Sequence, residues 1–459
     1  MNTSSNLLNV IVLAAGKGTR MNSELPKVLH KIAGRSMLQH VLDTVKELNK
    51  NVKPTVVVGH GRDKIIQTFT DYACQWVEQA EQLGTGHALL QALPQLEDEG
   101  ISLILYGDVP LIGVETLQAL TSDIDDKSLG LLTVKLDNPT GYGRIIRNSN
   151  GDVTAIVEQK DASEAELAIT EINTGIMAVA NKHLKRWLPQ LSADNKQGEY
   201  YLTDIIAMAY ADNVTIKTCQ PLSPEEVEGI NSRSQQARLE RIYQQNCVQI
   251  LMDQGVSFAD PARFDCRGKL ETGRDIYIDI NVIIEGQVTI EDGCSIGPNC
   301  VIKNSHIGKN SQIKANSLLE DAYIHRDCEV GPYARLRPGT HLKEGAKIGN
   351  FVEVKKSIIG AGSKVNHLSY IGDCHMGAGV NIGAGTITCN YDGVNKVQTL
   401  IGDNCFVGSN SALVAPVELA RGTTVGAGSI INHNTEEDDL AVSRARQKNI
   451  KGWSRPVKK

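Results

Sequence analysis

The sequence predicts two folds in one chain: an α/β domain with a Rossmann-like sheet in the first half and an all-β coil, a left-handed parallel β-helix, in the second. In the first half, short apolar runs alternate with amphipathic stretches. In the second half, an aliphatic residue recurs about every six positions. The 459 residues also include 42 glycines but only 4% aromatic residues, which suits a tightly wound repeat with few rings in its core.

The first half has the pattern of an α/β sheet. Val10–Leu13, Thr55–Val58 and Ile101–Tyr106 are short apolar runs typical of buried strands, and Ser36–Leu48 has the pattern of a helix. Strands that alternate with helices predict a mostly parallel sheet. Such sheets bind ligands in the loops after their strands, and a glycine-rich turn and an aspartate follow two of these runs.

A long helix is expected between the halves. Apolar residues recur every four positions among arginines and glutamines, and Gly255 after them is typical of a helix C-cap. These apolar residues are Leu239, Tyr243, Cys247 and Leu251. The pattern divides the chain into a domain over residues 1–233, a linker helix over 234–254 and a β-helix domain over 255–459.

The second half repeats in steps of six residues, and three steps close one triangular coil of about 18 residues. One aliphatic side chain per step points inward: Ile278, Ile284, Ile290, Ile296, Ile302, Ile307, Ile313, Ile324, Val330, Leu336, Leu342, Ile348, Val354, Ile359, Val365, Ile371, Met376, Ile382, Ile401, Val407, Leu413, Leu419, Val425 and Ile431. Small residues fill a second inward position: Cys294, Cys300, Ser311, Ser317, Cys328, Ala334, Ser363, Thr386, Cys405, Ser411 and Ser429. The stretch 388–399 interrupts the repeat, which predicts a loop extruded from the coil.

The composition argues against several classes of protein. A net charge of −6 is atypical of a general nucleic-acid binder. No apolar run approaches the ~18 residues that a membrane helix needs, and no basic residue precedes Val10–Ala15, so neither a membrane span nor a signal peptide is expected. The ten cysteines form no CxxC pair, so reduced thiols in a cytoplasmic protein are expected rather than zinc or disulfides.

Three short stretches of the first half could bind phosphate and metal. Backbone amides freed by Gly16 and Gly18 would suit a triphosphate, although the turn lacks the third glycine of the Rossmann fingerprint. Lys27 follows a proline and is either a phosphate ligand or a solvated surface lysine. Asp108 ends a strand on the ligand side, where a carboxylate either binds magnesium or caps a turn.

Taken together, the motifs resemble a known family. LxxGxGTRM from Leu13, then LPK, QLGTGHA from Gln82 and YGDVP from Tyr106 are similar to the sugar-phosphate nucleotidyltransferases. The joined β-helix narrows the resemblance to the bifunctional N-acetylglucosamine-1-phosphate uridylyltransferases/glucosamine-1-phosphate acetyltransferases. It covers essentially the whole chain and includes further motifs at 139–144, 156–160, 172–175 and 198–204.

The resemblance implies two reactions and their cosubstrates. The second half would transfer an acetyl group from acetyl-CoA to glucosamine 1-phosphate. The first half, a nucleotidyltransferase domain, would then transfer uridylyl from UTP with Mg²⁺, giving UDP-N-acetylglucosamine and pyrophosphate. In bacteria this product feeds peptidoglycan and lipopolysaccharide. The resemblance also implies a homotrimer with acetyl-transfer sites between adjacent subunits.

The resemblance assigns residues of the first half to UTP and the sugar nucleotide. Asp108 and Asn231 would bind magnesium; without the resemblance, Asn231 would read as a helix N-cap. Gln79, Gly84 and Thr85 would read the uracil, whose edge offers two carbonyls and one N–H. The full set is Leu13, Ala14, Ala15, Gly16, Lys27, Gln79, Gly84, Thr85, Tyr106, Gly107, Asp108, Gly143, Glu158, Asn173 and Asn231.

In the second half, His367 falls on the family's general base, although a lone histidine in a coil is more often structural. A group with a near-neutral pKa suits removal of a proton from the attacking amine. The sugar-phosphate residues would be Arg337, Lys355, Tyr370 and Asn381. The acetyl-CoA residues would be Ala384, Asn390, Tyr391, Ser409, Ala427 and Arg444, with the Ala384 N–H facing the thioester oxygen.

Two other functions are compatible with the fold. A single-activity pyrophosphorylase could use its β-helix only to bind an effector, and a β-helix could also serve purely as a trimerisation scaffold. Neither alternative calls for His367 beside a loop that carries Asn390 and Tyr391. The basic tail from Arg444 to Lys459 is either a solubilising end or a contact for coenzyme A phosphates.

Overall fold

The computed structural model describes residues 7–458 and divides the chain into two compact units. The first unit extends to Tyr243 and the second begins at Gln244.

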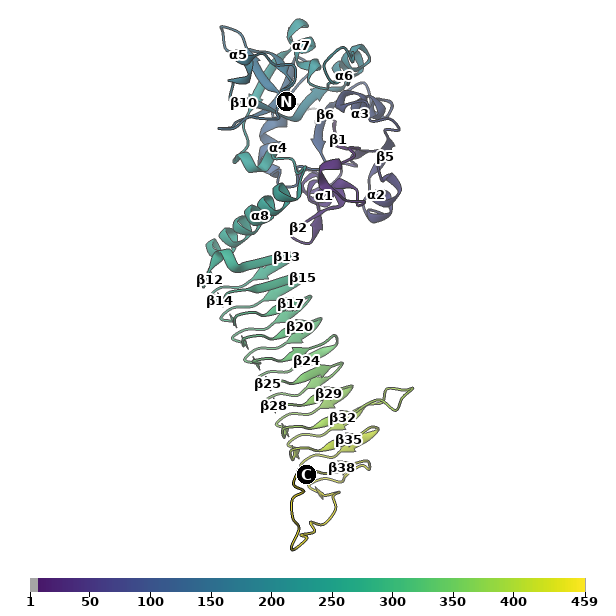
Figure 1. The fold of residues 1–459 in the computed structure, drawn as a ribbon, viewed down its shortest axis with the longest axis vertical. Helices are drawn as coiled ribbons and strands as arrows, with labels where there is room; N and C mark the ends of the chain where they lie inside the picture. Colours follow the sequence, from purple (N-terminus) through teal and green to yellow (C-terminus); the bar gives the residue numbers. More distant parts are fainter. Residues whose placement is uncertain (1–6, 459) are drawn as a thin grey trace, which may run out of the picture. The chain divides into compact units, whose positions relative to one another are not determined.

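The first unit is built on a nine-stranded sheet with the order β11-β7-β10-β6-β1-β4-β5, to which β8 and β9 are added beside β10 (Figure 1). The strands are β1 (Leu8–Ala14), β4 (Thr55–Val58), β5 (Gln75–Glu78), β6 (Ile101–Tyr106), β7 (Ser128–Lys135), β8 (Arg144–Arg147), β9 (Val153–Val157), β10 (Glu171–Ala180) and β11 (Thr215–Cys219). A small hairpin of β2 (Lys31–Ile32) and β3 (Arg35–Ser36) lies apart from this sheet.

The sheet is mixed rather than mostly parallel. Strands β5, β4, β1 and β6 are parallel, as expected, but β10 runs antiparallel to both β6 and β7. The chain reaches β10 through the antiparallel pair β8 and β9, and antiparallel neighbours need only short connections. Strand direction is set by these connections and not by apolar patterning, so the patterning did not predict it.

Helices cover the sheet, and apolar cores lie on both of its faces. Helix α1 begins after Ser36, whose hydroxyl accepts a hydrogen bond from the Gln39 N–H, a typical N-cap. The helices of this unit are α1 (Met37–Leu48), α2 (Arg62–Thr68), α3 (Thr85–Ala92), α4 (Val114–Thr121), α5 (Glu164–Leu167), α6 (Asn181–Trp187) and α7 (Asp204–Ala211).

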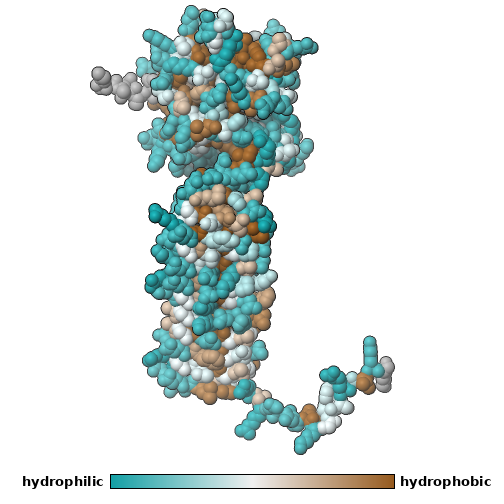
Figure 2. Space-filling model, turned by 90° about the vertical axis from the view of Figure 1, so that its left-hand side faces the viewer, coloured by the Kyte–Doolittle hydropathy of each residue, from teal (hydrophilic) through white to brown (hydrophobic). Residues whose placement is uncertain are grey.

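Helix α8 (Arg233–Asp253) occupies the stretch where a linker helix was expected. It carries many polar and charged residues. Within residues 7–458, none of the helices combines the length and apolar character that a membrane span requires. The visible face of each unit in Figure 2 is largely hydrophilic, with smaller apolar areas.

The second unit is a parallel β-helix. Strands one coil apart pair in parallel, most of them at offsets of 17 or 18 residues, as in Ile296 with Ile313 and Val330 with Ile348. One face is an eleven-stranded sheet: β12 (Val256–Phe258), β14 (Ile276–Ile278), β16 (Ser295–Ile296), β19 (Gln312–Ile313), β22 (Glu329–Val330), β25 (Lys347–Asn350), β28 (Lys364–His367), β31 (Asn381–Ile382), β34 (Phe406–Val407), β37 (Thr424–Val425) and β39 (Leu440–Ala441).

The other faces form a continuous seventeen-stranded sheet. Its strands are β13 (Phe264–Thr272), β15 (Val282–Ile290), β17 (Val301–Lys303), β18 (His306–Ile307), β20 (Leu318–Glu320), β21 (Ala322–Ile324), β23 (Arg335–Leu336), β24 (Thr340–Leu342), β26 (Glu353–Lys355), β27 (Ile358–Ile359), β29 (Tyr370–Gly372), β30 (Cys374–Met376), β32 (Ile387–Cys389), β33 (Thr399–Ile401), β35 (Ala412–Val414), β36 (Val417–Leu419) and β38 (Ile430–Ile431).

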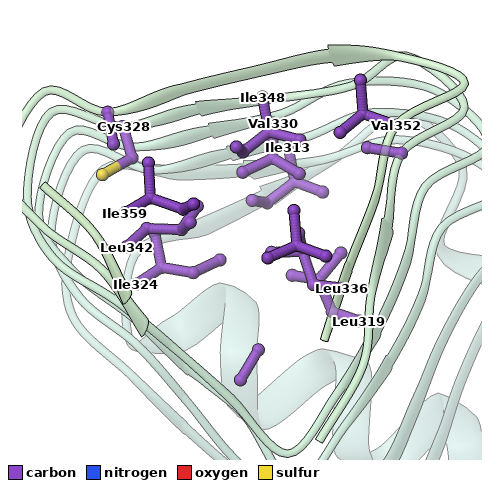
Figure 3. Close-up of a cluster of buried hydrophobic side chains, with 14 of the residues drawn as sticks. Ile313, Leu319, Ile324, Cys328, Val330, Leu336, Leu342, Ile348, Val352 and Ile359 are labelled. Atoms are coloured by element: carbon purple, nitrogen blue, oxygen red, sulfur yellow. The ribbon is translucent and has the colours of Figure 1, made fainter. Parts of the chain in front are cut away.

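The interior of the coil confirms the six-residue pattern. Figure 3 shows aliphatic side chains from three sides meeting inside the coil, where Ile313, Leu319 and Ile324 come from successive strands. Every aliphatic residue of the repeat named in the sequence analysis is buried. Stacking identical inward positions one coil apart therefore produces a continuous apolar core.

The small inward residues are also buried, and several join successive coils. The Ser311 hydroxyl donates to the His325 carbonyl and accepts from the Cys328 N–H of the next coil. Cys328 itself is fully buried, and burial raises the pKa of its thiol to about 11. These cysteines thus behave as small, protonated core residues.

One corner of the coil is turned by residues with positive φ. Asn281, Asn299 and Asn316 occupy this corner in three consecutive coils, each with φ near +60°. Their side chains form a ladder, with Asn299 donating to Asn316 over 3.2 Å. Asparagine tolerates the left-handed conformation better than most residues. In the next three coils bulky residues take this position: Tyr333, Phe351 and Leu368.

The core predicts a size limit at the small inward positions. Cys328→Leu should destabilise the second unit by about 1–3 kcal/mol, because an added isobutyl group has no space between the stacked coils. Cys328→Ala should cause a smaller loss. Urea unfolding followed by circular dichroism measures both, and equal stability of the leucine variant and the wild type would contradict the packing described here.

Candidate active sites

A cleft of about 530 Å³ opens beyond the carboxyl ends of strands β1 and β6 in the first unit. It brings together residues predicted from the sequence to bind UTP: Leu13, Ala14, Ala15, Gly16, Lys27, Gln79, Gly84, Thr85, Tyr106 and Asp108. Strands β1 and β6 are neighbours, so the loops after them lie side by side. The structure thus collects residues that are up to 95 positions apart in the chain.

The glycine turn after β1 makes room for Lys27. Gly18 has φ +62°, and a Cβ there would lie 2.6 Å from the Lys27 Cβ. Lys27 begins a short 3-10 helix after Pro26, whose ring fixes the approach of the chain. The lysine stem therefore passes directly over Gly18 into the cleft.

Lys27 and Asp108, which line the cleft, form a compact polar cluster with Asn231. The Lys27 Nζ lies 2.5 Å from Asp108 Oδ2 and 2.6 Å from Asn231 Oδ1. The Lys27 and Asp108 side chains are only 12% and 19% exposed. The Ile230 N–H donates to the Asp108 carbonyl over 2.9 Å, which brings the segment before α8 to the end of β6.

Gln79 lies at another end of the cleft, after β5. Its side-chain amide donates to the Gly84 carbonyl over 3.1 Å and contacts His87 Nδ1 at 3.1 Å. Gly84 has φ +112°, and a Cβ there would lie 2.6 Å from the Tyr200 carbonyl oxygen, so a side chain would not fit. Thr85 begins α3 directly after this turn.

Gly143, Glu158 and Asn173 form a neighbouring group. The Asn173 N–H donates to the Gly143 carbonyl, and the Thr203 hydroxyl donates to Glu158 Oε1 over 3.1 Å. Burial raises the pKa of Glu158, and nearby carboxylates add to the shift. Tyr106 lies near both this group and Asp108. Burial raises the pKa of its hydroxyl, and the carboxylates of Glu158 and Asp108 raise it further.

Some residues that line the cleft were not predicted from the sequence. Lys17, Gln82 and Glu199 also line the cleft, and Gln82 donates to the Gln79 carbonyl over 3.1 Å. Gln82 stands in a motif used for the resemblance, but nothing in its spacing distinguishes it from a surface glutamine. The N–H of Gly107, a residue predicted to lie in the site, donates a hydrogen bond to the Leu13 carbonyl and thereby continues the pairing of β1 with β6.

In the second unit, His367 belongs to a column of residues at one corner of the coil. Each member stands directly before a corner residue with positive φ, one coil after the last: Asn350, His367, Ala384, Ser409 and Ala427. The N–H of each corner residue donates to the column residue of the coil before, for example Gly385 to His367 and Asn410 to Ala384. Arg444 ends the column by donating to the Ala427 carbonyl over 2.7 Å.

Asn350 is a neighbour of His367 that the sequence did not indicate. The two residues pair across β25 and β28, and Asn350 Oδ1 lies 2.8 Å from His367 Nδ1. With Nδ1–H donating to that oxygen, the lone pair of Nε2 is left to accept a proton. A one-coil offset of 17 residues creates this contact, and only the coil register could have revealed it.

Cations gather at another corner of the same coils. Lys355 is aligned with Gly372 in the next coil, and a Cβ at Gly372 would overlap the Tyr370 hydroxyl. The ammonium of Lys396 beside it, and Arg337 nearby, hold the pKa of Lys355 below its usual range. Lys396 lies in the extruded loop and was not predicted from the sequence.

The loop that interrupts the repeat projects from the coil after β32 (Figure 1). Asn390 begins it and donates to Asp373 Oδ2 over 2.5 Å, whereas Tyr391 is exposed and pairs with Lys396 across the loop. Asn381 lies on a different face, in β31 beside Lys364 and Phe406. Within residues 7–458, the predicted acetyl-transfer residues therefore lie at several corners and faces of the coil.

Comparison with known proteins agrees with both units. The model of the MobA-like NTP transferase domain matches residues 10–201, and the hexapeptide repeat of succinyl-transferase matches residues 287–320 and 398–433. The bifunctional protein GlmU of Cellvibrio japonicus is 59% identical over 453 residues, which are 99% of this chain and all of that protein. Those of Saccharophagus degradans and Marinobacter nauticus are 60% and 55% identical over 99% and 98% of this chain and 100% and 99% of their own lengths.

The chain belongs to the GlmU family. It is a bifunctional enzyme with a nucleotidyltransferase unit and a hexapeptide-repeat acetyltransferase unit. Its activities are those expected above, uridylyl transfer and acetyl transfer, with a nucleotide and an acyl-CoA as substrates. Among residues 7–458, no group of three or more His, Cys, Asp or Glu side chains could hold a metal ion.

The position of Lys27 over Gly18 gives a test with an internal control. Gly18→Ala should lower uridylyl transfer about tenfold or more, because the new methyl group displaces Lys27 and a side chain with φ +62° strains the turn. Acetyl transfer by the same preparation should be unchanged, which would exclude general misfolding. Wild-type uridylyl transfer by this variant would contradict the role of Gly18.

Proposed function

We propose that uridylyl transfer takes place in the cleft of the first unit, at the Lys27, Asp108 and Asn231 cluster. An oxygen of the sugar 1-phosphate attacks the α-phosphorus of UTP, and pyrophosphate leaves. The attacking phosphate is already ionised, so positioning and charge neutralisation carry the catalysis and no strong base is needed. Lys27 neutralises phosphate charge, and the exposed amides of the turn after β1 bind the phosphates.

The cleft and the group beside it suit the two halves of the product. Gln79, Gly84 and Thr85 at one end of the cleft would offer amide and backbone groups to the uracil, and the neighbouring group of Gly143, Glu158 and Asn173 would bind the sugar. Asp108 and Asn231 offer two oxygens that already hold a cationic group, which is the donor chemistry that Mg²⁺ prefers. Mg²⁺ bound there, completed by phosphate oxygens and water, would supply further charge neutralisation at the α-phosphate.

For acetyl transfer we propose His367 as general base, oriented by Asn350. His367 Nε2 takes a proton from the 2-amine of glucosamine 1-phosphate as the nitrogen attacks the thioester carbonyl carbon, and coenzyme A leaves as the thiolate. The Ala384 N–H faces the developing oxyanion. Arg337, Lys355, Lys396 and Tyr370 bind the phosphate group.

The column from Ala384 to Arg444 suits an elongated cosubstrate. Parallel strands are about 4.8 Å apart, so Ala384, Ser409 and Ala427 offer one contact in each of three consecutive coils. Acetyl-CoA lying along this corner would place its thioester near His367 and its phosphates near Arg444 and the basic tail. Asn390 and Tyr391 would border it from the projecting loop.

We propose that a homotrimer completes the acetyl-transfer site. His367 and the Lys355 cluster lie at different corners of the coil in one chain. A second copy packed against the first would bring the His367 corner of one chain next to the Lys355 corner of the other. Tyr333, Phe351 and Leu368 follow the asparagine ladder at its corner and are 52%, 57% and 63% exposed. Bulky side chains with φ near +50° are unfavourable by about 1–2 kcal/mol each, which a subunit contact would offset.

The substrates and cosubstrates are those of the cytoplasm, where we place the enzyme.

The Lys27–Asp108–Asn231 cluster is the observation that carries the first site, and the His367–Asn350 pair carries the second. His367→Ala should lower acetyl transfer by about 10²–10⁴-fold, the usual share of a general base, with uridylyl transfer unchanged. Asn350→Ala should cause a smaller loss of the same activity. Release of coenzyme A thiol measures the first reaction, and pyrophosphate release the second.

Asp108→Asn should have the opposite effect to His367→Ala: uridylyl transfer is impaired and acetyl transfer is retained. Uridylyl transfer at saturating Mg²⁺ should fall at least tenfold because the carboxylate that binds the cation is gone, and acetyl transfer should remain. Loss of both activities in either variant would indicate a folding defect. Normal pyrophosphate release by Asp108→Asn would contradict the proposed cation site.

The corner residues give a test of the trimer. Phe351→Asn installs the residue found at this corner in other coils, so the coil should fold normally while the subunit contact weakens. Sedimentation velocity should then show smaller species, and acetyl transfer should fall while uridylyl transfer persists. Leu222→Asn, which replaces an exposed apolar residue of the first unit, is the matched control. A fully active Phe351→Asn monomer would contradict shared sites.

A further inference from the structure

A lysine ammonium occupies the position between the two oxygens assigned to the metal. Lys27 Nζ lies within 2.6 Å of one oxygen from each of Asp108 and Asn231. Both members of the ion pair are largely shielded from water, so the interaction is screened far less than a surface salt bridge. The structure thus contains a cation bound to the chain itself at the position that the proposed function gives to a metal ion.

The surroundings hold the three groups in this arrangement. The Asn231 N–H donates to Gln235 Oε1 over 2.8 Å, and its side-chain amide faces the Gly229 carbonyl, which leaves Oδ1 directed at Lys27. The Ile230 N–H fixes the same segment against the Asp108 backbone. The oxygens are therefore positioned before any ligand binds.

The ammonium and a divalent cation exclude each other at these oxygens. Mg²⁺ requires its ligand oxygens at about 2.0–2.1 Å, which would place it within a few ångströms of Lys27 Nζ. Two like charges at that separation in a shielded site repel strongly. Lys27 must consequently leave Asp108 and Asn231 when a metal ion binds them, and it needs another anion as its partner.

We propose that Lys27 is an exchangeable internal cation that blocks the metal site until nucleotide phosphates draw it away. Resting on the proposed function of the cleft, this assigns Lys27 two positions. Without nucleotide it neutralises Asp108, and with nucleotide it pairs with a phosphate and vacates the two oxygens. Metal and nucleotide binding are then positively coupled, because each favours the same displacement of Lys27.

Direct metal binding in the absence of nucleotide tests this exchange. Calorimetric titration of the full-length protein with Mn²⁺ should show weak binding for the wild type. Lys27→Met should bind Mn²⁺ at least about tenfold more tightly, because Asp108 is then a shielded carboxylate without its cation. Lys27→Gln is a second variant with a polar side chain and should shift in the same direction.

Three control variants make the result specific. Lys17→Met removes another lysine of the same cleft and should leave Mn²⁺ affinity unchanged. Lys27→Arg keeps the charge and should remain weak. The double variant Lys27→Met/Asp108→Asn should lose the gain. A thermal-shift measurement should show that Mn²⁺ stabilises Lys27→Met more than the wild type, since ligand binding to the folded state raises stability.

The outcomes distinguish a failure of the proposed Lys27 exchange from a failure of the proposed function. If neither Lys27→Met nor Lys27→Gln binds Mn²⁺ more tightly than the wild type, although Asp108→Asn still impairs uridylyl transfer, the exchange is wrong and the site assignment stands. If the gain appears but persists in the Asp108→Asn double variant, the metal binds elsewhere, and both the exchange and the assignment of Asp108 are overturned.

Discussion

The narrow interior of the triangular coil is the constraint from which most of the second unit follows. It admits one aliphatic side chain per strand in each coil and only small residues beside it, as the buried positions of Ile313, Leu319, Ile324 and Cys328 show. Because the same position recurs one coil later, outward residues also form columns. The column that contains His367 and ends at Arg444 is a direct consequence, and so is the contact between His367 and Asn350. The repeat that packing requires therefore also spaces the residues of this column evenly, and the proposed acetyl-CoA site uses this spacing.

The proposed site of the first unit has a different structural basis. It lies where parallel strands end, and a backbone hydrogen bond from Ile230 to Asp108 helps to hold the Lys27–Asp108–Asn231 cluster together. Lys27 reaches this cluster because Gly18 has no side chain. The two sites thus depend on different elements, each within its own unit, and each activity serves as the folding control for the other.

Much of this was predictable from the sequence. The six-residue period determined the β-helix because packing repeats with the chain, and the apolar runs located β4 and β6 at their observed bounds. The antiparallel direction of β10 was not predictable, since apolar patterning carries no direction. Asn350 and Lys396 were missed because their roles arise from a register of 17 residues and from a loop folding back on the coil. The ion pair between Lys27 and Asp108 joins residues 81 positions apart, which no local pattern could reveal.

The central claim is that the enzyme carries two separate reaction sites, one for each reaction, linked only by a shared intermediate. Mixing separately purified His367→Ala and Asp108→Asn proteins with glucosamine 1-phosphate, acetyl-CoA, UTP and Mg²⁺ tests it most directly, with UDP-N-acetylglucosamine measured by chromatography. Each variant alone should form little product, and the mixture should form it readily, because one protein supplies N-acetylglucosamine 1-phosphate to the other. A mixture as inactive as its components, although each retains its remaining activity, would contradict the account.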